Sequence, residues 1–265
     1  MGKRTKYEPG TFSWAELSTT DPDAAKAFYG ELLGWEANDL PLPDGGTYSM
    51  MRIAGEPVAA IQKKPDFQDR LPSYWFNYVT VASADETAAA AKGAGGNVHM
   101  EPFDVMDSGR MTVIMDPTGA AFGVWEPNQH IGAALVNDPG TLTWNELSTT
   151  DPARAMEFYE TLFGWSFQAL DTGDFPPYWS IGHEGAAAGR NGGMRELPEE
   201  HRAEGVPSNW MPYFAVGSAE QAIGVSEGAG GTKLFGPLQV PAGRFAVIQD
   251  PQGAIFGVVD GDFDD

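Results

Sequence analysis

Two glutamates that occupy equivalent positions in a repeated stretch are the strongest candidates for chemistry in this sequence. Residues 11–35 (TFSWAELSTTDPDAAKAFYGELLGW) return as residues 141–165 (TLTWNELSTTDPARAMEFYETLFGW), an ungapped match at an offset of 130 in which 15 of 25 positions are identical. Glu16 and Glu146 lie in the apolar opening of each copy. A buried carboxylate without a partner is costly, so each should have a raised pKa or a cationic partner, and each could then act as a general base. Alternatively, each glutamate is solvated or paired with an arginine.

A strand followed by a short helix must position each glutamate. Phe12, Trp14 and Glu16 alternate with residues that point the other way, which predicts a strand with these three side chains on one face. Asp21-Pro22 then predicts a helix N-cap with proline at the first helical position. The repeat therefore begins with a strand, a turn and an amphipathic helix.

The rest of each half continues this plan with further strands and one more helix. A second helix is predicted after Ser83, where Ser-Ala-Asp-Glu has the capping-box pattern, and Ser218 opens its counterpart. The chain thus predicts an α+β fold of four βαβββ units in two pairs. Residues 190–206 interrupt the second half, and we predict a surface loop there. In the first half the other predicted strands cover residues 36–40, 47–53, 57–62, 75–81, 97–102, 110–115 and 121–125.

Composition excludes several classes of function. The 265 residues carry a net charge of −21, which would repel a nucleic-acid backbone. No apolar run is long enough to span a membrane, and we see no secretory signal peptide. The chain has no cysteine, which fits a cytoplasmic location and excludes thiolate sites. The acidic surface could favour a cationic ligand, or it serves only solubility.

Three motifs carry a resemblance to a known family. The strand-Asp-Pro-helix opening that ends in FYxxLxGW, the AGG turns at 94–96 and 229–231, and the stretch DPTGAAFGVWEP at 116–127 resemble the vicinal oxygen chelate superfamily. That family includes glyoxalase I, bleomycin-resistance proteins and extradiol dioxygenases. More narrowly, the chain resembles a tandem actinobacterial subgroup labelled glyoxalase-like or hydroxylase-like. The resemblance implies two cupped mixed sheets with helices on the convex side.

The resemblance also implies a division of the chain into two domains. We expect a lead-in at residues 1–10, a glyoxalase-like domain at 11–126, a linker at 127–139, a second glyoxalase-like domain at 140–260 and an acidic tail at 261–265.

Metal enzymes of this family bind a divalent ion through His, Gln or Glu side chains on the first and last strands of the units. In this sequence the corresponding positions carry Trp, Phe, Met or Gly, none of which is a usual ligand for a divalent metal. One further position, near Gln62, cannot be aligned closely enough to place. We therefore expect neither metal nor cofactor. The positions that can be placed are Trp14, Trp144, Phe76, Met211, Gly123 and Gly257.

The cups are instead predicted to be aromatic, which suits a flat organic ligand. Tyr48 and Tyr178 either donate hydrogen bonds in the cups or pack in the core. Arg110 and Arg244 either pair with the glutamates, anchor an anion, or lie on the surface. The predicted lining is Phe12, Trp14, Glu16, Phe76, Tyr78 and Trp125 in the first cup, and Leu142, Trp144, Glu146, Met211 and Tyr213 in the second.

Three functions follow from this lining. The first is a metal-independent protein that binds an aromatic or hydrophobic natural product, as the resemblance to bleomycin-resistance proteins implies. The second is a metal-free enzyme of secondary metabolism or aldehyde detoxification, hydroxylase-like or lyase-like, with Glu16 or Glu146 as catalytic base. The third is a scaffold or surface antigen with degenerate cups, which collapsed and filled cavities would favour. For the first two we expect a small organic partner and a monomer or homodimer.

Overall fold

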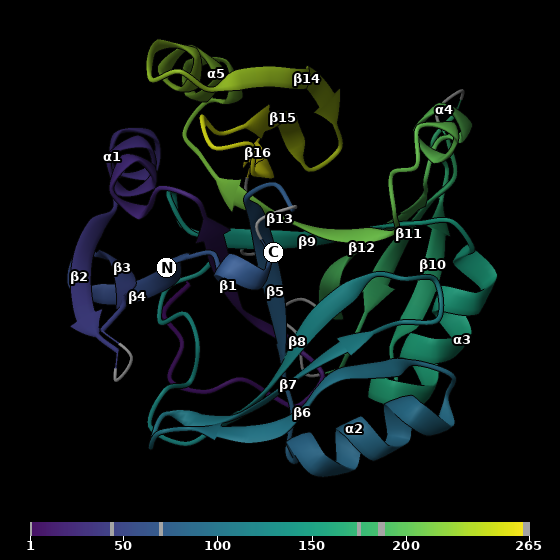
Figure 1. The fold of residues 1–265 in the computed structure, drawn as a ribbon. Helices are drawn as coiled ribbons and strands as arrows, with labels where there is room; N and C mark the ends of the chain where they lie inside the picture. The colour runs from purple at the N-terminus through teal and green to yellow at the C-terminus, as the bar shows by residue number, and fades with distance from the viewer. Residues whose placement is uncertain (1, 43–44, 69–70, 174–175, 185–188, 262–265) are drawn as a thin grey trace.

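The computed structural model describes residues 2–42, 45–68, 71–173, 176–184 and 189–261 (Figure 1). Within these ranges the chain forms two eight-stranded mixed sheets with few helices, and each sheet contains two βαβββ units, which confirms the predicted fold class. Most of the expected acidic tail lies outside the described residues. None of the described helices has the length and apolar character that a membrane crossing requires.

The first sheet is built from the first half of the chain. Its centre is β1, which pairs in parallel with β4 and antiparallel with β5. The two units therefore join through the strands that open them. Across the sheet the order is β2 (Glu36–Pro41), β3 (Thr47–Ile53), β4 (Glu56–Lys63), β1 (Phe12–Thr19), β5 (Tyr74–Thr80), β8 (Ala121–Pro127), β7 (Gly109–Met115) and β6 (Asn97–Val105).

The second sheet repeats this order and corrects one prediction. Residues 190–206 are not a surface loop, because they contain β12 and the short helix α4 (Glu199–Ala203). β12 pairs with β9 just as β4 pairs with β1. Across the sheet the order is β10 (Ser166–Leu170), β11 (Tyr178–Gly182), β12 (Arg190–Glu196), β9 (Leu142–Thr149), β13 (Asn209–Ala215), β16 (Ile255–Asp260), β15 (Gly243–Gln249) and β14 (Thr232–Val240).

The helices begin where the sequence predicts. Asp21 caps the first long helix by accepting a hydrogen bond from the Ala24 amide, and Ser83 caps the second in the same way. Gly34 ends the first helix in the left-handed conformation, at φ 74°. The four long helices are α1 (Pro22–Leu33), α2 (Ala84–Gly93), α3 (Pro152–Phe163) and α5 (Ala219–Gly228), and η1 (Asp66–Gln68) is a single 3₁₀ turn.

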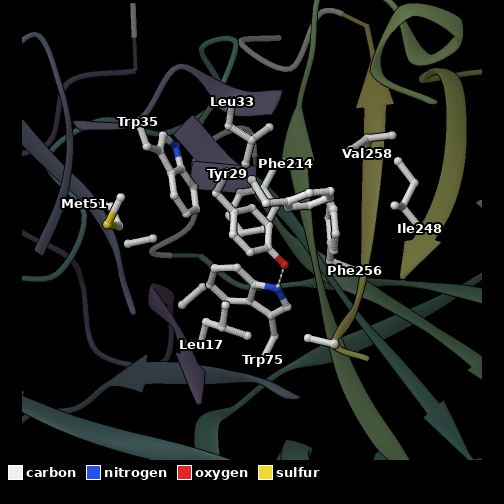
Figure 2. Close-up of a cluster of buried hydrophobic side chains, with 14 of the residues drawn as sticks. Leu17, Tyr29, Leu33, Trp35, Met51, Trp75, Phe214, Ile248, Phe256 and Val258 are labelled. Atoms are coloured by element: carbon white, nitrogen blue, oxygen red, sulfur yellow. Dashed lines mark hydrogen bonds between the residues drawn. The ribbon is translucent and has the colours of Figure 1, made fainter. Parts of the chain in front are cut away.

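Two hydrophobic cores join the sheets through these helices. In one core, α1 and the strands beside it pack against residues from β13, β15 and β16 of the other sheet, while α1 lies beside α5 (Figure 1). Figure 2 shows Tyr29 of α1 at its centre, where its hydroxyl accepts a hydrogen bond from Trp75 Nε1 at 3.0 Å. The same hydroxyl donates to Asp250 Oδ2 in the second half, also at 3.0 Å.

The other core repeats this arrangement with the halves exchanged. Tyr159 of α3 donates to Asp116 Oδ2 at 3.0 Å and accepts from Trp210 Nε1 at 2.8 Å. Each half therefore supplies the helix of one core and the acidic turn of the other. Each of the two cores therefore contains residues from both sheets.

A β-bulge corrects the predicted face of Phe12. The pairing of β1 with β5 shifts register between Phe12 and Trp14, which turns Phe12 to the helical side of the sheet. There it packs against Trp165 and Trp210, with ring centroids 5.4 and 4.9 Å away. Leu142 follows the same course and lies in the core around Tyr29. Neither residue lines a cup.

Candidate ligand-binding cups

We call the face of each sheet that lies away from the long helices a cup. The first cup comprises Trp14, Glu16, Tyr48, Gln62, Phe76, Tyr78, Met111 and Trp125. The second comprises Trp144, Glu146, Tyr178, Arg195, Met211, Tyr213, Phe245 and Val259.

Glu16 lies in the first cup inside a shell of neutral hydrogen-bond donors and is only 8% exposed. Tyr48 donates to its Oε2 at 2.8 Å, and Gln62 Nε2 donates to its Oε1 at 2.6 Å. Tyr78 adds a longer hydrogen bond to Oε1, at 3.3 Å. Trp14 Nε1 in turn donates to the Tyr48 hydroxyl at 3.2 Å.

The charge of Glu16 is therefore stabilised by hydrogen bonds alone. Burial raises its pKa above 4.5, and the bonds from Tyr48, Tyr78 and Gln62 counter only part of that rise. Burial and the nearby carboxylate also hold the pKa of both tyrosines well above 10, so their hydroxyls stay protonated as donors. This is the direction expected for a cup-facing glutamate, and within the described part of the chain no cation pairs with it.

The segment that links the two halves fills the first cup. His130 stands edge-on to the Trp14 ring at 4.7 Å, and its carbonyl accepts a hydrogen bond from Trp125 Nε1 at 2.8 Å. Ala133, which is fully buried, donates its amide proton to the Ser13 carbonyl at 2.8 Å. Burial lowers the pKa of His130 to about 4, and its Nε2 has no hydrogen-bond partner among the described residues.

The N-terminal segment holds this linker in place from outside. Lys3 forms an antiparallel bridge with Leu135, and Tyr7 donates to the Ala133 carbonyl at 2.7 Å. Lys3 also pairs with Glu56 at 2.5 Å. The first cup is thus covered by two layers of the protein's own chain, the linker and the N-terminal segment. A covered cup is what the scaffold hypothesis expects.

Glu146 lies in the second cup beside a cation. Tyr213 donates to its Oε1 at 3.3 Å, and Tyr178 hydrogen-bonds to it as Tyr48 does to Glu16. Arg195 Nε lies 3.2 Å from the same Oε1. Burial raises the pKa of Glu146, while Arg195 and the two phenols act in the opposite direction. Trp144 Nε1 donates to the Tyr178 hydroxyl at 3.0 Å, as in the first cup.

The residues around the two glutamates differ at one equivalent position, which is Gln62 in the first cup and Arg195 in the second. Gln62 pairs across the sheet with Ser18 on one side and Tyr48 on the other. Arg195 has the same register, between Ser148 and Tyr178. The first cup therefore places a neutral amide where the second places a guanidinium.

The second cup is less covered than the first around its tryptophan, while its glutamate is as deeply buried, at 7% exposed for Glu146 and 8% for Glu16. Trp144 is partly exposed, whereas Trp14 is 4% exposed, and the neighbouring Thr143 is partly exposed where Ser13 is fully buried. Among the described residues, no segment packs on Trp144 as residues 130–136 pack on Trp14.

Known proteins are similar in sequence to nearly the whole chain. The chain is 43% identical over 262 residues to "Putative glyoxylase CFP32" of Mycobacterium tuberculosis, with 98% of both chains covered. The profile of the Glyoxalase/Bleomycin resistance protein/Dioxygenase superfamily matches residues 11–124. The chain belongs to this superfamily. It is also 32% identical over 271 residues to the anthracycline biosynthesis protein DnrV of Streptomyces peucetius, covering 97% of this chain and 95% of that protein.

Solved members of the glyoxalase superfamily share the fold. The Mn(II)-bound glyoxalase of Novosphingobium aromaticivorans superposes with a TM-score of 0.66 at 17% identity, covering 98% of this chain and 86% of the other. The 2,3-dioxygenase LapB of Pseudomonas sp. KL28 gives the same TM-score at 14% identity, covering 96% and 92%.

The cups do not fit the metal that some superfamily members hold. Each offers a single carboxylate whose oxygens already accept hydrogen bonds, and the described part of the chain contains no group of three or more His, Asp or Glu side chains able to hold an ion. Gly123 and Gly257 have a different use. A Cβ at Gly123 would overlap the Tyr78 ring, and one at Gly257 would overlap Tyr213, so these glycines make room for the phenols that reach the glutamates.

The structure separates the predicted site residues into four groups. Trp14, Phe76, Tyr78 and Trp125 share the first cup with Tyr48, and Trp144, Tyr178, Met211 and Tyr213 share the second. Phe12 lies in the core. Arg110 and Arg244 do not partner the glutamates, because they form ion pairs at the sheet edges: Arg110 with Asp85 and Asp104, and Arg244 with Glu220 and Asp260.

The sequence analysis did not recognise Arg195 or Gln62 as partners of the glutamates. Had NGGMRE been interpreted as a strand, Arg195 would have aligned with Gln62, so the signal was present. Two shallow hollows of about 320 and 300 Å³ lie where α1 meets α5 and where α2 meets α3. Neither hollow borders Glu16 or Glu146, and neither contains a buried carboxylate surrounded by phenols as the cups do.

Proposed function

We propose that this protein binds a flat aromatic or hydrophobic small molecule in its second cup without a metal ion. The observation that carries the proposal is the lining: one carboxylate, two phenols and a partly exposed Trp144 stand where metalloenzymes of the superfamily need several ion ligands. Aromatic walls with a few oriented polar groups suit a planar organic ligand. Since the linker covers Trp14 but no described segment covers Trp144 in the same way, we propose that a ligand enters the second cup at Trp144.

The relatives support a ligand of this kind. The superfamily name includes bleomycin resistance proteins, and two relatives are named for anthracycline biosynthesis. Anthracyclines are flat, fused-ring quinones, a shape that can stack on an indole. We propose that the ligand is a natural product of similar shape.

Binding can be tested by calorimetric titration of the whole protein with anthraquinone-2-carboxamide and a panel of aromatic antibiotics. The buffer contains a chelator, and the metal content of the protein is measured beforehand. We expect saturable binding at one site that neither the chelator nor added Mn²⁺ changes. Absence of binding across the panel, or binding only after metal is added, would refute the proposal.

A second candidate is a metal-free enzyme with a glutamate as general base. It is favoured by the raised pKa of a carboxyl group that faces an aromatic cup. Glu146 fits this role better than Glu16, which the linker covers. Glu146→Gln should abolish turnover while leaving the fold intact, and turnover that survives both Glu146→Gln and Glu16→Gln would exclude the mechanism.

We further propose that the protein works in the cytoplasm, since a chain without cysteine suits a reducing compartment. Each core already joins the two sheets within one chain, so a monomer is sufficient. Light scattering on the purified protein distinguishes it from a homodimer.

A further inference from the structure

We infer that the second cup selects aromatic ligands that carry an acidic group, such as a carboxylate or an ionised phenol, and that Arg195 is the specificity-determining residue. This inference rests on the proposed function, because it names the ligand class for the same cup. It departs from the expectation that the acidic surface favours a cation.

The described contacts of Arg195 engage its guanidinium only through Nε. Its Nε donates to Ser148 Oγ at 2.9 Å and lies 3.2 Å from Glu146 Oε1. Within the described chain, no group accepts a hydrogen bond from its Nη1 or Nη2. The side chain is 36% exposed, so a ligand can approach these donors.

The free end of the guanidinium has the geometry that acidic groups need. Two terminal nitrogens in one plane can donate a parallel pair of hydrogen bonds to a carboxylate, or a single pair to a phenolate and its neighbouring carbonyl. Tyr178 lies directly across the strand pair from Arg195, and the Trp144 indole is bonded to Tyr178. An aromatic ring on Trp144 would therefore have its acidic substituent close to Arg195.

Glu146 does not prevent an anion from binding here. Its charge is already opposed by Arg195, and burial raises its pKa. A second negative charge nearby favours the protonated form further, so the site can take up a proton rather than leave two anions in contact.

The first cup provides an internal control for this inference. There Gln62 occupies the register of Arg195 and satisfies Glu16 with a neutral amide at 2.6 Å. The fold thus already accommodates an amide at this position beside a buried glutamate. Arg195→Gln copies that arrangement, so its effect on binding can be separated from an effect on folding.

The test compares two ligands of nearly equal shape, the anionic anthraquinone-2-carboxylate and the neutral anthraquinone-2-carboxamide, in titrations of the whole protein. We expect the carboxylate to bind with one-to-one stoichiometry and about tenfold or more tighter than the amide, in the range of a charge-assisted contact. Arg195→Gln should weaken the carboxylate more than the amide and so remove that preference. Arg195→Lys should keep part of the preference, because it keeps the charge.

Arg154→Gln is the matched control, since it removes the same charge from an exposed position on α3. It should change neither affinity. If the amide binds but Arg195→Gln weakens both ligands equally, or changes neither, the inference fails while the proposed function survives. If neither compound nor any member of the antibiotic panel binds, both fail. Thermal unfolding of each variant verifies that it is folded.

Discussion

Trp14 and Trp144 occupy equivalent positions in the two cups, and truncating each should separate a structural tryptophan from a ligand-facing one. Trp14 is 4% exposed beneath His130, whereas Trp144 is partly exposed. We expect Trp14→Ala to destabilise the protein strongly without changing ligand binding at the second cup. Trp144→Ala should destabilise it less and weaken binding of the anthraquinone ligands.

The magnitudes follow from burial. Replacing a fully buried tryptophan by alanine typically costs about 3–5 kcal/mol, and Trp14 also loses its hydrogen bond to Tyr48, which contributes about 1 kcal/mol. Trp144 loses the equivalent bond to Tyr178, but part of its ring is already in water. Its truncation should therefore cost about 1–2 kcal/mol less than that of Trp14.

Both variants can be compared by urea denaturation followed by circular dichroism, because the far-ultraviolet signal arises mainly from the backbone. The slope of free energy against urea should stay equal to that of the wild type, so that the midpoints report stability. If Trp144→Ala costs as much as Trp14→Ala, the second cup is packed as tightly as the first. The argument that only the second cup is open to a ligand would then be wrong.

Three further outcomes are expected. Tyr29→Phe removes a hydroxyl that donates to Asp250 and should lower the free energy of unfolding by about 1–3 kcal/mol in urea denaturation, so a loss below about 0.5 kcal/mol would contradict the buried bond. Because burial raises the pKa of Glu16, the native state binds more protons than the unfolded state. The contribution of Glu16 to the free energy of unfolding is therefore greatest below its ordinary pKa of 4.5 and falls as pH rises through its pKa in the folded state. Glu16→Gln should flatten that fall in Tm above pH 4.5, and an unchanged slope would exclude Glu16 as its source. Gly257→Ala should cost about 1–3 kcal/mol in the same denaturation assay because the added Cβ overlaps the Tyr213 ring, and a neutral result would show that the ring can move freely.

Local patterns predicted the elements of this fold well. The repeat at an offset of 130, the caps at Asp21 and Ser83, and the alternation around Glu16 all depend on neighbours in sequence, and the structure confirms them. The assignment of Glu16 and Trp14 to one face of the sheet follows from the same alternation. It is confirmed because β1 is regular from Trp14 onward.

The errors arise where contacts distant in sequence decide the conformation. The bulge that turns Phe12 inward follows from packing against Trp165 and Trp210 of the other half, which no local pattern encodes. Residues 190–206 resemble a loop because of their glycines, yet a Cβ at Gly193 would overlap Tyr178, so glycine is required within that strand. The linker was assigned only as a connection, although HIGAALV at 130–136 is more apolar than a solvated connection needs to be.

The two cores contain side chains from both halves, whereas each cup is built largely from one half, and this difference decides which substitutions the chain tolerates. The interior around Tyr29 and Tyr159 mixes residues from both sheets, so a substitution there is felt by the whole chain. Each cup draws its side chains from a single sheet and, in the first, from the adjoining linker. In a duplicated chain of this kind, substitutions in one cup can change its ligand while the other cup keeps a structural role. The difference between Gln62 in the first cup and Arg195 in the second is the kind of change that this separation permits.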